Sequence, residues 1–310
     1  MPSIQEKGVK IAVILNGLSL YKKIFDRKFL PLLRQNFSVD VFETRTKNDA
    51  ILLTSKAAET YQYKAILAAG GDGTVHQVVN GLIRGREDQG FLPPIGVIPM
   101  GSGNDFAKTA GLKKDPRHLL SILQNFSTRK INLGKITYMD FEGNVRERYF
   151  INVADIGMGP EVVRRVTDSG RAFGSVVAYY KSIITTFFTY KPVQVTAKTS
   201  DWQWNGKLRS LAVGNGKYYG HGLCIAPDAI LDDDILNIFI CGNVSVFDFI
   251  RYSQTLKRGG HIRIPEVSYR ETTSISVSSE AECLVEGDGE ILGKLPAKIE
   301  LMGRRVEFLM

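Results

Sequence analysis

The chain has 310 residues and a formal net charge of +8; 44% of its residues are hydrophobic and 23% are charged. This composition is ordinary for a soluble globular protein, and the length predicts one large or two modest domains. The longest apolar stretch, residues 174–190, contains a lysine and several threonines, so it falls short of the about 20 mostly apolar residues that span a membrane. Three scattered cysteines exclude a disulfide framework and indicate a reducing cytoplasm.

The first part of the chain alternates short apolar strands with helical patterns. Strands are predicted at residues 9–15, 39–43, 65–69 and 95–99, and helices at 21–34, 49–61 and directly after each of the last two strands. This alternation predicts an α/β domain with a doubly wound parallel sheet over residues 1–128. The N-terminus is polar and leads directly into the first strand, so we expect no secretory signal.

From residue 129 onward, strand-like runs are joined by turns rich in glycine, aspartate and asparagine. The predicted strands are 129–138, 146–154, 193–199, 207–213, 236–240, 274–278, 282–286 and 298–301, with helical insertions at 160–167, 174–190 and 246–257. Residues 129–296 are therefore predicted to form an antiparallel β-sandwich domain with helical insertions.

A glycine-rich turn joins the third predicted strand to its helix in the stretch KAILAAGGDGTVHQVVNGL, residues 64–82. Successive glycines let backbone N–H groups approach a phosphate closely, and the N-terminus of a helix favours anions. Asp72, in the same turn, can face a magnesium ion. The turn therefore predicts nucleotide binding by Gly70, Gly71, Asp72, Gly73 and Thr74, with Val75 and His76 in the first turn of the helix.

A second glycine-rich turn follows the fourth strand in PIGVIPMGSGNDFAKTAGL, residues 94–112, where Ser102, Asn104 and Asp105 are candidate ligand residues. Ligands of open parallel sheets bind beyond the carboxyl ends of the strands, so two such turns are expected to converge on one ligand. The alternative is that the glycines only shape tight turns and that Asp105 merely caps its helix.

These two motifs, in this order, resemble the diacylglycerol kinase catalytic family, which includes bacterial lipid kinases, sphingosine kinases and ceramide kinases. Three later stretches strengthen the resemblance: FINVADIGMG (150–159), NGKYYGHGLCIAPDA (215–229) and EGDGEILGKLPAKIELM (286–302). The resemblance implies an enzyme of phospholipid biosynthesis that uses ATP and Mg²⁺ to phosphorylate the hydroxyl of diacylglycerol, phosphatidylglycerol or a long-chain base. It also implies that residues 297–310 return to complete the first domain.

The resemblance assigns roles to individual residues. Asp72 and Asp105 would hold Mg²⁺, and Asn16 and Thr44 would lie beside the nucleotide, although a strand-end hydroxyl explains Thr44 equally well. Glu290, in the sequence Asp288-Gly289-Glu290, would be the catalytic base. Asp-Gly is also the commonest hairpin dipeptide, and a hairpin turn could itself present Glu290 to the cleft.

A second metal site of the family falls on residues 230–236, ILDDDIL. The resemblance assigns it the side chain of Asp233 and the carbonyl groups of Ile230 and Ile235, whereas the alternative is a solvated turn. Asp234 occupies the position of the family's usual glycine. Two further departures concern the family's Asp-Leu-Gly, which here begins with Asn132, and the glutamate after GGDGT, which here is Gln77.

The helix expected at 174–190 is apolar around most of its circumference, as in an ordinary buried helix or in the wall of an acyl-chain channel. Nearby basic residues could meet lipid head groups: Arg164, Arg165, Arg171, Lys181 and Lys191. We therefore expect a cytoplasmic protein that associates peripherally with a membrane, where it meets its lipid substrate. No nucleic-acid partner is expected, and the oligomeric state is left between a monomer and a homodimer.

Two alternatives remain open at this stage. NAD kinases share GGDGT and a two-domain plan, but SGNDFAK and the late Asp-Gly-Glu favour the lipid kinases. The departures at Asn132 and Gln77 motivate a weakened or non-catalytic protein that binds lipid or nucleotide.

Overall fold

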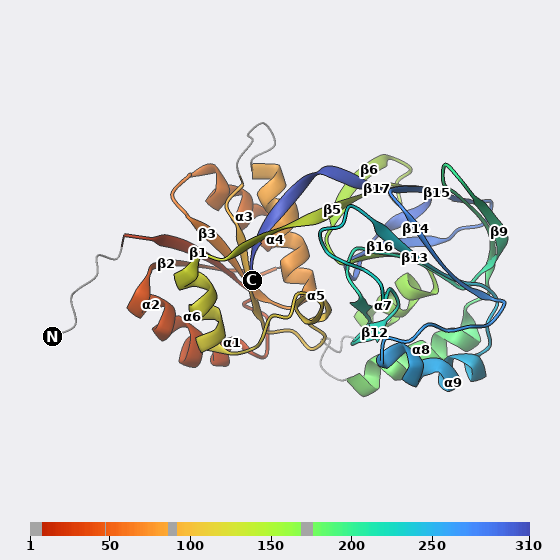
Figure 1. Cartoon of the computed structure of the whole chain (residues 1–310), viewed down its shortest axis with the longest axis horizontal. Coiled ribbons are helices and arrows are strands. Elements are labelled where there is room, and N and C mark those ends of the chain that lie inside the picture. The colour runs from red at the N-terminus through yellow and green to blue at the C-terminus, as the bar shows by residue number, and fades with distance from the viewer. Residues whose placement is uncertain (1–7, 47, 86–91, 169–175) are drawn as a thin grey trace. The chain divides into compact units, whose positions relative to one another are not determined.

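The computed structural model describes residues 8–46, 48–85, 92–168 and 176–310. The chain folds into two compact units, Met1–Ile131 with Val306–Met310 and Asn132–Arg305 (Figure 1). The division lies close to the one predicted after residue 128, and the segment that returns to the first unit is shorter than residues 297–310.

The first unit contains a parallel sheet with strand order β2–β1–β3–β4. Its strands are β1 (Lys10–Leu15), β2 (Ser38–Glu43), β3 (Ala65–Gly70) and β4 (Ile95–Pro99). β3 and β4 are buried along their whole length and consist mainly of small and branched apolar residues, as parallel strands covered on both faces require. The predicted α/β domain with a parallel sheet is confirmed.

Helices cover both faces of this sheet. They are α1 (Lys22–Ile24), the π-helical η1 (Phe25–Phe29), α2 (Leu30–Asn36), α3 (Asp49–Glu59), α4 (Asp72–Gly85), α5 (Asp105–Thr109) and α6 (Pro116–Asn125). Phe25, Phe29, Leu33 and Leu123 pack together in the core on one face of the sheet. Helix α6 was not predicted, although Asp115 caps it by accepting a hydrogen bond from the Arg117 N–H (3.0 Å).

The second unit is built on antiparallel strands, and the predicted sandwich with helical insertions is confirmed. Its main strands are β5 (Thr128–Met139), β6 (Val145–Phe150), β7 (Val153–Gly157), β8 (Val193–Lys198), β9 (Gln203–Leu208), β10 (Ser210–Gly214), β13 (Leu236–Cys241), β14 (Val267–Thr272), β15 (Ser274–Ser279), β16 (Leu284–Gly287) and β17 (Glu290–Leu309). β17 ends in the first unit, where Phe308 pairs with Ile95 of β4.

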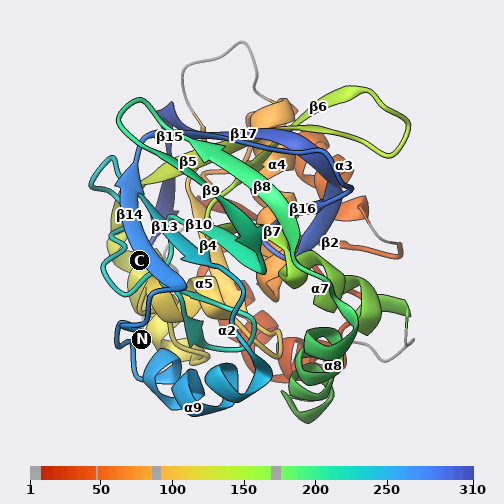
Figure 2. The same cartoon turned by 90° about the vertical axis from the view of Figure 1, so that its right-hand side faces the viewer.

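Three helices pack on one side of strands β7, β10 and β13: α7 (Met158–Asp168), α8 (Val176–Thr189) and α9 (Val246–Lys257) (Figure 2). The short hairpin of β11 (Tyr218–Tyr219) and β12 (Leu223–Cys224) lies beside them. Arg171 and the start of the helix predicted at 174–190 lie outside the described residues. Among the residues described, no helix combines the length and the apolar character that crossing a membrane would demand.

Two predicted strands are each divided in the structure. The strand predicted at 146–154 is interrupted at Ile151 and Asn152, because their N–H groups donate to the carboxylate of Asp288 (3.0 and 2.9 Å) and not to a neighbouring strand. The strand predicted at 207–213 is interrupted at Arg209, which separates β9 from β10. Strand β14 was not predicted, because its residues are mostly half-exposed and show no clear alternation.

Two acidic residues are buried on the helix-covered side of the second unit. Asp155 of β7 is opposite Glu286 of β16, and both side chains are almost fully buried. Asp155 Oδ1 accepts hydrogen bonds from Ser210 Oγ (2.9 Å) and from the N–H of Ile156 (2.8 Å). Burial raises the pKa of Asp155 to about 7 and raises the pKa of Glu286 well above its usual value.

These raised pKa values predict a stability that falls with pH. Between about pH 4 and pH 7 the folded chain retains protons that the unfolded chain has lost, so the free energy of unfolding decreases over this range. Asp155→Asn removes the ionising group while its amide oxygen can still accept from Ser210. We expect the variant to lose less stability than the wild type between pH 5 and pH 8, by about 2–3 kcal/mol, in denaturant unfolding followed by circular dichroism.

Asp140→Asn is the matched control. This carboxylate is half-buried, and hydrogen bonds, above all from the N–H of Asn144, lower its pKa to about 2. Its substitution should leave the slope between pH 5 and pH 8 unchanged. An equal slope in the wild type and in Asp155→Asn would contradict the assignment.

Candidate active site

The two glycine-rich loops of the first unit touch through their backbones. A Cβ atom on Gly101 would lie 2.5 Å from the Cα of Gly71, and a Cβ atom on Gly71 would lie 3.0 Å from the Cα of Gly101. The N–H of Met100 donates to the carbonyl of Gly70 (2.7 Å), which holds the loops side by side. Only glycine at both positions permits this approach, so the predicted convergence of the two turns has a direct steric cause.

Polar side chains gather at the carboxyl ends of β1, β2 and β3. Asn16 Nδ2 donates to Thr74 Oγ1 (3.5 Å), and a Cβ atom on Gly70 would collide with that hydroxyl at 2.1 Å. Thr44 Oγ1 accepts a hydrogen bond from the N–H of Gly17 (3.2 Å). Asn16, Thr44 and Thr74 therefore lie at the same edge of the sheet as the glycine loops, where ligands of such sheets bind.

The second loop is closed by its own asparagine. Asn104, which has a positive φ of 54°, accepts from the N–H of Gly101 and donates to the carbonyl of Gly101, both at 2.8 Å. Ser102, half-buried, lies inside this ring. The hydrogen bonds fix the backbone that a phosphate would approach.

Asp72 and Asp105 flank this loop at Gly103. A Cβ atom on Gly103 would lie 3.2 Å from Asp72 Oδ2 and 3.5 Å from Asp105 Oδ2. The Asp72 carboxylate also accepts from the N–H groups of Asp105 (3.1 Å) and Phe106 (3.0 Å), so it caps helix α5. Sequence reasoning missed this capping bond because it joins residues 33 and 34 positions apart.

Two carboxylates at one point supply oxygen ligands of the kind that Mg²⁺ prefers, so the donor set fits that ion. Within the described ranges, no group of three or more His, Cys, Asp or Glu side chains is placed to hold a metal. The side chains of Val75 and His76 are buried, so at these positions only backbone groups could face a nucleotide. A Cβ atom added to Gly73 would have no heavy atom within 4 Å, so there is open space beside this residue.

In the second unit, Glu290 follows a two-residue hairpin turn between β16 and β17. Both turn residues, Asp288 and Gly289, have positive φ (50° and 84°), as a type I′ turn requires. The Asp288 carboxylate accepts from the N–H groups of Ile151, Asn152 and Val153 at 2.9–3.0 Å. The hairpin is thus present, and it anchors the half-buried Glu290, whose role as a base stays a prediction.

The loop at 230–236 contains Asp234, which is hydrogen-bonded to Asn132, another residue that departs from the family's pattern. Asp233 Oδ1 accepts from the N–H of Ile235 (3.0 Å), and Asp234 has a positive φ of 62°, which explains the family's glycine at that position. The fully buried Asn132 carboxamide, oriented to satisfy its neighbours, donates to Asp234 Oδ1 (3.1 Å) and accepts from the N–H of Asp234 (3.0 Å). The carboxylate missing at position 132 is therefore present at 234, in direct contact.

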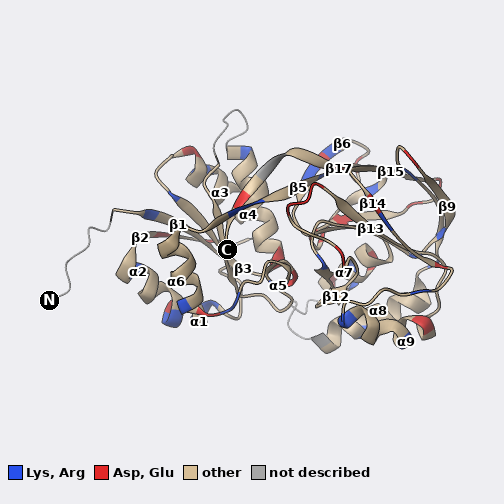
Figure 3. Ribbon diagram, viewed as in Figure 1, with Lys and Arg blue, Asp and Glu red and all other residues tan. Residues whose placement is uncertain are grey.

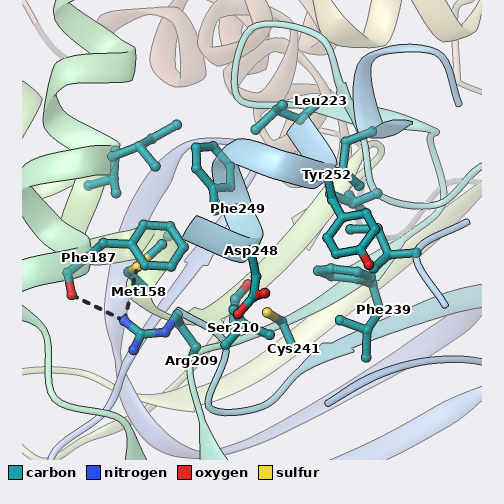
Figure 4. A pocket seen from close by; sticks show the side chains of 18 of the residues that line it. Met158, Phe187, Arg209, Ser210, Leu223, Phe239, Cys241, Asp248, Phe249 and Tyr252 are labelled. Carbon is teal, nitrogen blue, oxygen red and sulfur yellow. Dashed lines mark hydrogen bonds between the residues drawn. The ribbon is translucent and has the colours of Figure 1, made fainter. Parts of the chain in front are cut away.

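An apolar pocket of about 80 Å³ lies between the helices α7, α8 and α9 and the sheet of the second unit (Figure 4). Its polar lining includes Arg209 and Ser210, and the hydroxyl of Ser210 donates a hydrogen bond to the buried Asp155. Sequence reasoning placed α8 beside such a channel but did not identify these residues. The signal was available, since Arg209 and Ser210 interrupt an otherwise apolar strand, LRSLAV.

The contact between Asn132 and Asp234 predicts that substitutions at the two positions have coupled effects on stability. Asn132→Asp alone places a fully buried carboxylate within hydrogen-bond distance of the exposed carboxylate of Asp234, and we expect a loss of stability of about 1–2 kcal/mol. The double variant Asn132→Asp/Asp234→Gly removes the repulsion and places glycine at a positive φ, so it should recover most of that loss. Thermal and denaturant unfolding measure both. Additive losses in the double variant would disprove the coupling.

Comparison with known proteins places this geometry in a family. Residues 10–136 match the diacylglycerol kinase catalytic domain, and residues 153–310 match the YegS C-terminal NAD kinase beta sandwich-like domain. A diacylglycerol kinase of Staphylococcus haemolyticus is 28% identical over 94% of this chain and 84% of its own length. A diacylglycerol kinase of Staphylococcus carnosus is 27% identical over 94% of this chain and 91% of its own length.

A crystal structure of a diacylglycerol kinase from Bacillus anthracis superposes with a TM-score of 0.70 at 21% identity, over 98% of both chains. That likeness supports the fold, and the two domain matches together span nearly the whole chain. The chain belongs to the diacylglycerol kinase family, with a catalytic domain followed by the family's C-terminal β-sandwich, and it is an enzyme of the lipid kinase class.

Proposed function

We propose that this enzyme transfers the γ-phosphate of ATP to the hydroxyl group of a membrane lipid, with Mg²⁺ as the metal. The observation that carries the proposal is the backbone contact between Gly71 and Gly101, which brings Asp72 and Asp105 together beside two glycine-rich loops. Diacylglycerol, phosphatidylglycerol and a long-chain base are the acceptors to be tested.

In this proposal the chain's residues position the phosphates. Backbone N–H groups of residues 71–73 and the Thr74 hydroxyl would bind them, aided by the N-terminus of α4. The N–H groups of Thr74 and Val75 are used within the turn, since both donate to the carbonyl of Gly71 (3.0 and 3.2 Å). Asn16 and Thr44 would lie beside the nucleoside, at the ends of β1 and β2. Mg²⁺, held by Asp72 and Asp105, would neutralise charge on the phosphates when bound.

Glu290 would accept the proton of the lipid hydroxyl as that oxygen attacks the γ-phosphorus and the bond to the β-phosphate oxygen breaks. Asp288 supports this role without touching the reaction, because its three backbone hydrogen bonds fix the hairpin that presents Glu290. The pocket between α7, α8 and α9 would receive apolar parts of the lipid. Asp233, with the carbonyls of Ile230 and Ile235, remains the proposed second cation site.

The test is phosphoryl transfer from labelled ATP to a total lipid extract, with the labelled product identified by mass. Glu290→Gln keeps the shape of the side chain but removes the base, so we expect turnover to fall about 100-fold or more. Glu280→Gln, at an exposed position, is the matched control and should keep full activity. Unchanged turnover in Glu290→Gln would remove the base from the proposal, and NADP formation from NAD and ATP would favour the NAD kinase alternative.

We further propose that helices α8 and α9 face an anionic membrane surface. The two helices are in contact, with the rings of Phe187 and Phe249 5.1 Å apart. Phe188 and Phe247 are 74% and 79% exposed, which is unusual for such large apolar side chains. Lys181 of α8 and Arg251 and Lys257 of α9 are exposed. Figure 3 colours lysine and arginine blue along the ribbon. Exposed aromatic rings beside basic side chains suit anionic lipid head groups over an apolar interior.

Co-sedimentation with phosphatidylglycerol-containing vesicles tests this surface. Phe188→Ser/Phe247→Ser should reduce the bound fraction at least about fivefold, because each ring contributes buried apolar area at the membrane. Phe141→Ser, which removes a 60% exposed ring from the β5–β6 hairpin, is the control and should bind like the wild type. Loss of binding in the control but not in the double variant would place the membrane surface elsewhere.

A further inference from the structure

Arg209 is a buried cation in the wall of the apolar pocket. The residue is 7% exposed and lies between β9 and β10, directly before Ser210. The guanidinium lies beside the ring of Phe187, 4.8 Å from its centroid, and near the thioether of Met158 (Figure 4). Its Nη1 donates to the carbonyl of Phe187 at 3.4 Å, whereas Nε is buried without a hydrogen-bond partner.

No carboxylate in the described ranges forms an ion pair with this guanidinium. Asp248 also lines the pocket, but its carboxylate accepts from the N–H and the hydroxyl of Ser245 at the start of α9. The thiol of Cys241, also in the lining, is neutral at pH 7 because burial raises its pKa to about 12. A buried arginine without a counter-charge is costly, and an anionic ligand would remove that cost.

The rest of the pocket is suited to hydrocarbon. Its walls include Ile183, Phe187, Phe239, Phe249 and Leu256. The volume of about 80 Å³ corresponds to roughly five to eight water-sized groups, and therefore to a chain of similar carbon number. Arg209 is the basic side chain of this lining, and the carboxylate of Asp248, the acidic one, is held by Ser245 at the start of α9. The guanidinium therefore remains to meet one negative charge on the head of an acyl chain.

We propose that this pocket binds a fatty-acid anion, with the carboxylate on the guanidinium of Arg209 and the alkyl chain between α8, α9 and the sheet. A carboxylate can accept two parallel N–H bonds from one guanidinium and carries one charge, which a single arginine neutralises. A phosphate head would bring a second charge into the same apolar site. The proposed lipid substrate would place its apolar part in the same pocket, so the fatty-acid anion and that substrate would compete for it. The test measures binding alone and does not require phosphoryl transfer.

The test is calorimetric titration of the full chain with octanoate and with octanamide at pH 6, where octanoate is ionised and Asp155, which is hydrogen-bonded to Ser210 in the pocket lining, is mostly protonated. Octanamide has the same chain and a neutral head of similar size, so the wild type should bind octanoate at least tenfold more tightly. Arg209→Gln should lose that preference. Lys207→Gln, two positions away at an exposed site, makes the same change of charge and should bind octanoate like the wild type.

Circular dichroism checks that Arg209→Gln is folded, and the octanoate–octanamide comparison in the wild type decides the question even if that variant is not. No binding of octanoate, or equal binding of octanamide, would overturn the proposal. Tighter binding of octyl phosphate than of octanoate would overturn it in favour of a phosphate-headed lipid. Because no step measures phosphoryl transfer, an inactive kinase would not affect these results.

Discussion

Backbone amides that are left without a partner in a helix or sheet must find acceptors, and in each unit the aspartate of one sequence motif accepts from several of them. Asp72 accepts from the first amides of α5 and so ties the GGDGT loop to the loop after β4. Asp288 accepts from three successive amides that end at the first residue of β7 and so ties the Asp-Gly-Glu hairpin to that strand. Both residues belong to the motifs by which the family is recognised. Their hydrogen bonds show that each aspartate organises the backbone of its own motif.

The parts that local pattern determines were predictable from the sequence. β4 and α9 begin and end where their apolar periodicity and flanking signals predict, and Ser245 with Asp248 forms the capping box of α9. Predictions failed where a residue far away in the sequence determines where a strand ends. A strand was expected through Ile151 and Asn152, but the carboxylate of Asp288, more than 130 positions later, takes their amides. No local pattern encodes such a bond.

The candidate site shows the same division. The glycines, Asp72, Asp105 and Glu290 were identified from motifs, since each motif fixes a local backbone shape. The relation between Asn132 and Asp234 was not, because each alone appears as a departure that weakens the site. In the fold they form one hydrogen-bonded pair. The family's pattern has its aspartate at position 132 and a glycine at position 234, whereas this chain has asparagine at 132 and its aspartate at 234. The sequence therefore preserves one carboxylate at this point, which argues against reading Asn132 as a sign of lost function.

The buried polar groups on the helix-covered side of the second unit follow a single electrostatic rule. Asp155 and Glu286 can be buried because a carboxyl group escapes the cost of desolvation by keeping its proton, and their raised pKa values express this. The thiol of Cys241 does the same. Arg209 cannot, because a guanidinium does not lose its proton in a protein. Of these groups, Arg209 alone stays charged and therefore needs a negative charge beside it. An anion with an apolar tail, bound in the pocket that Arg209 lines, can supply that negative charge.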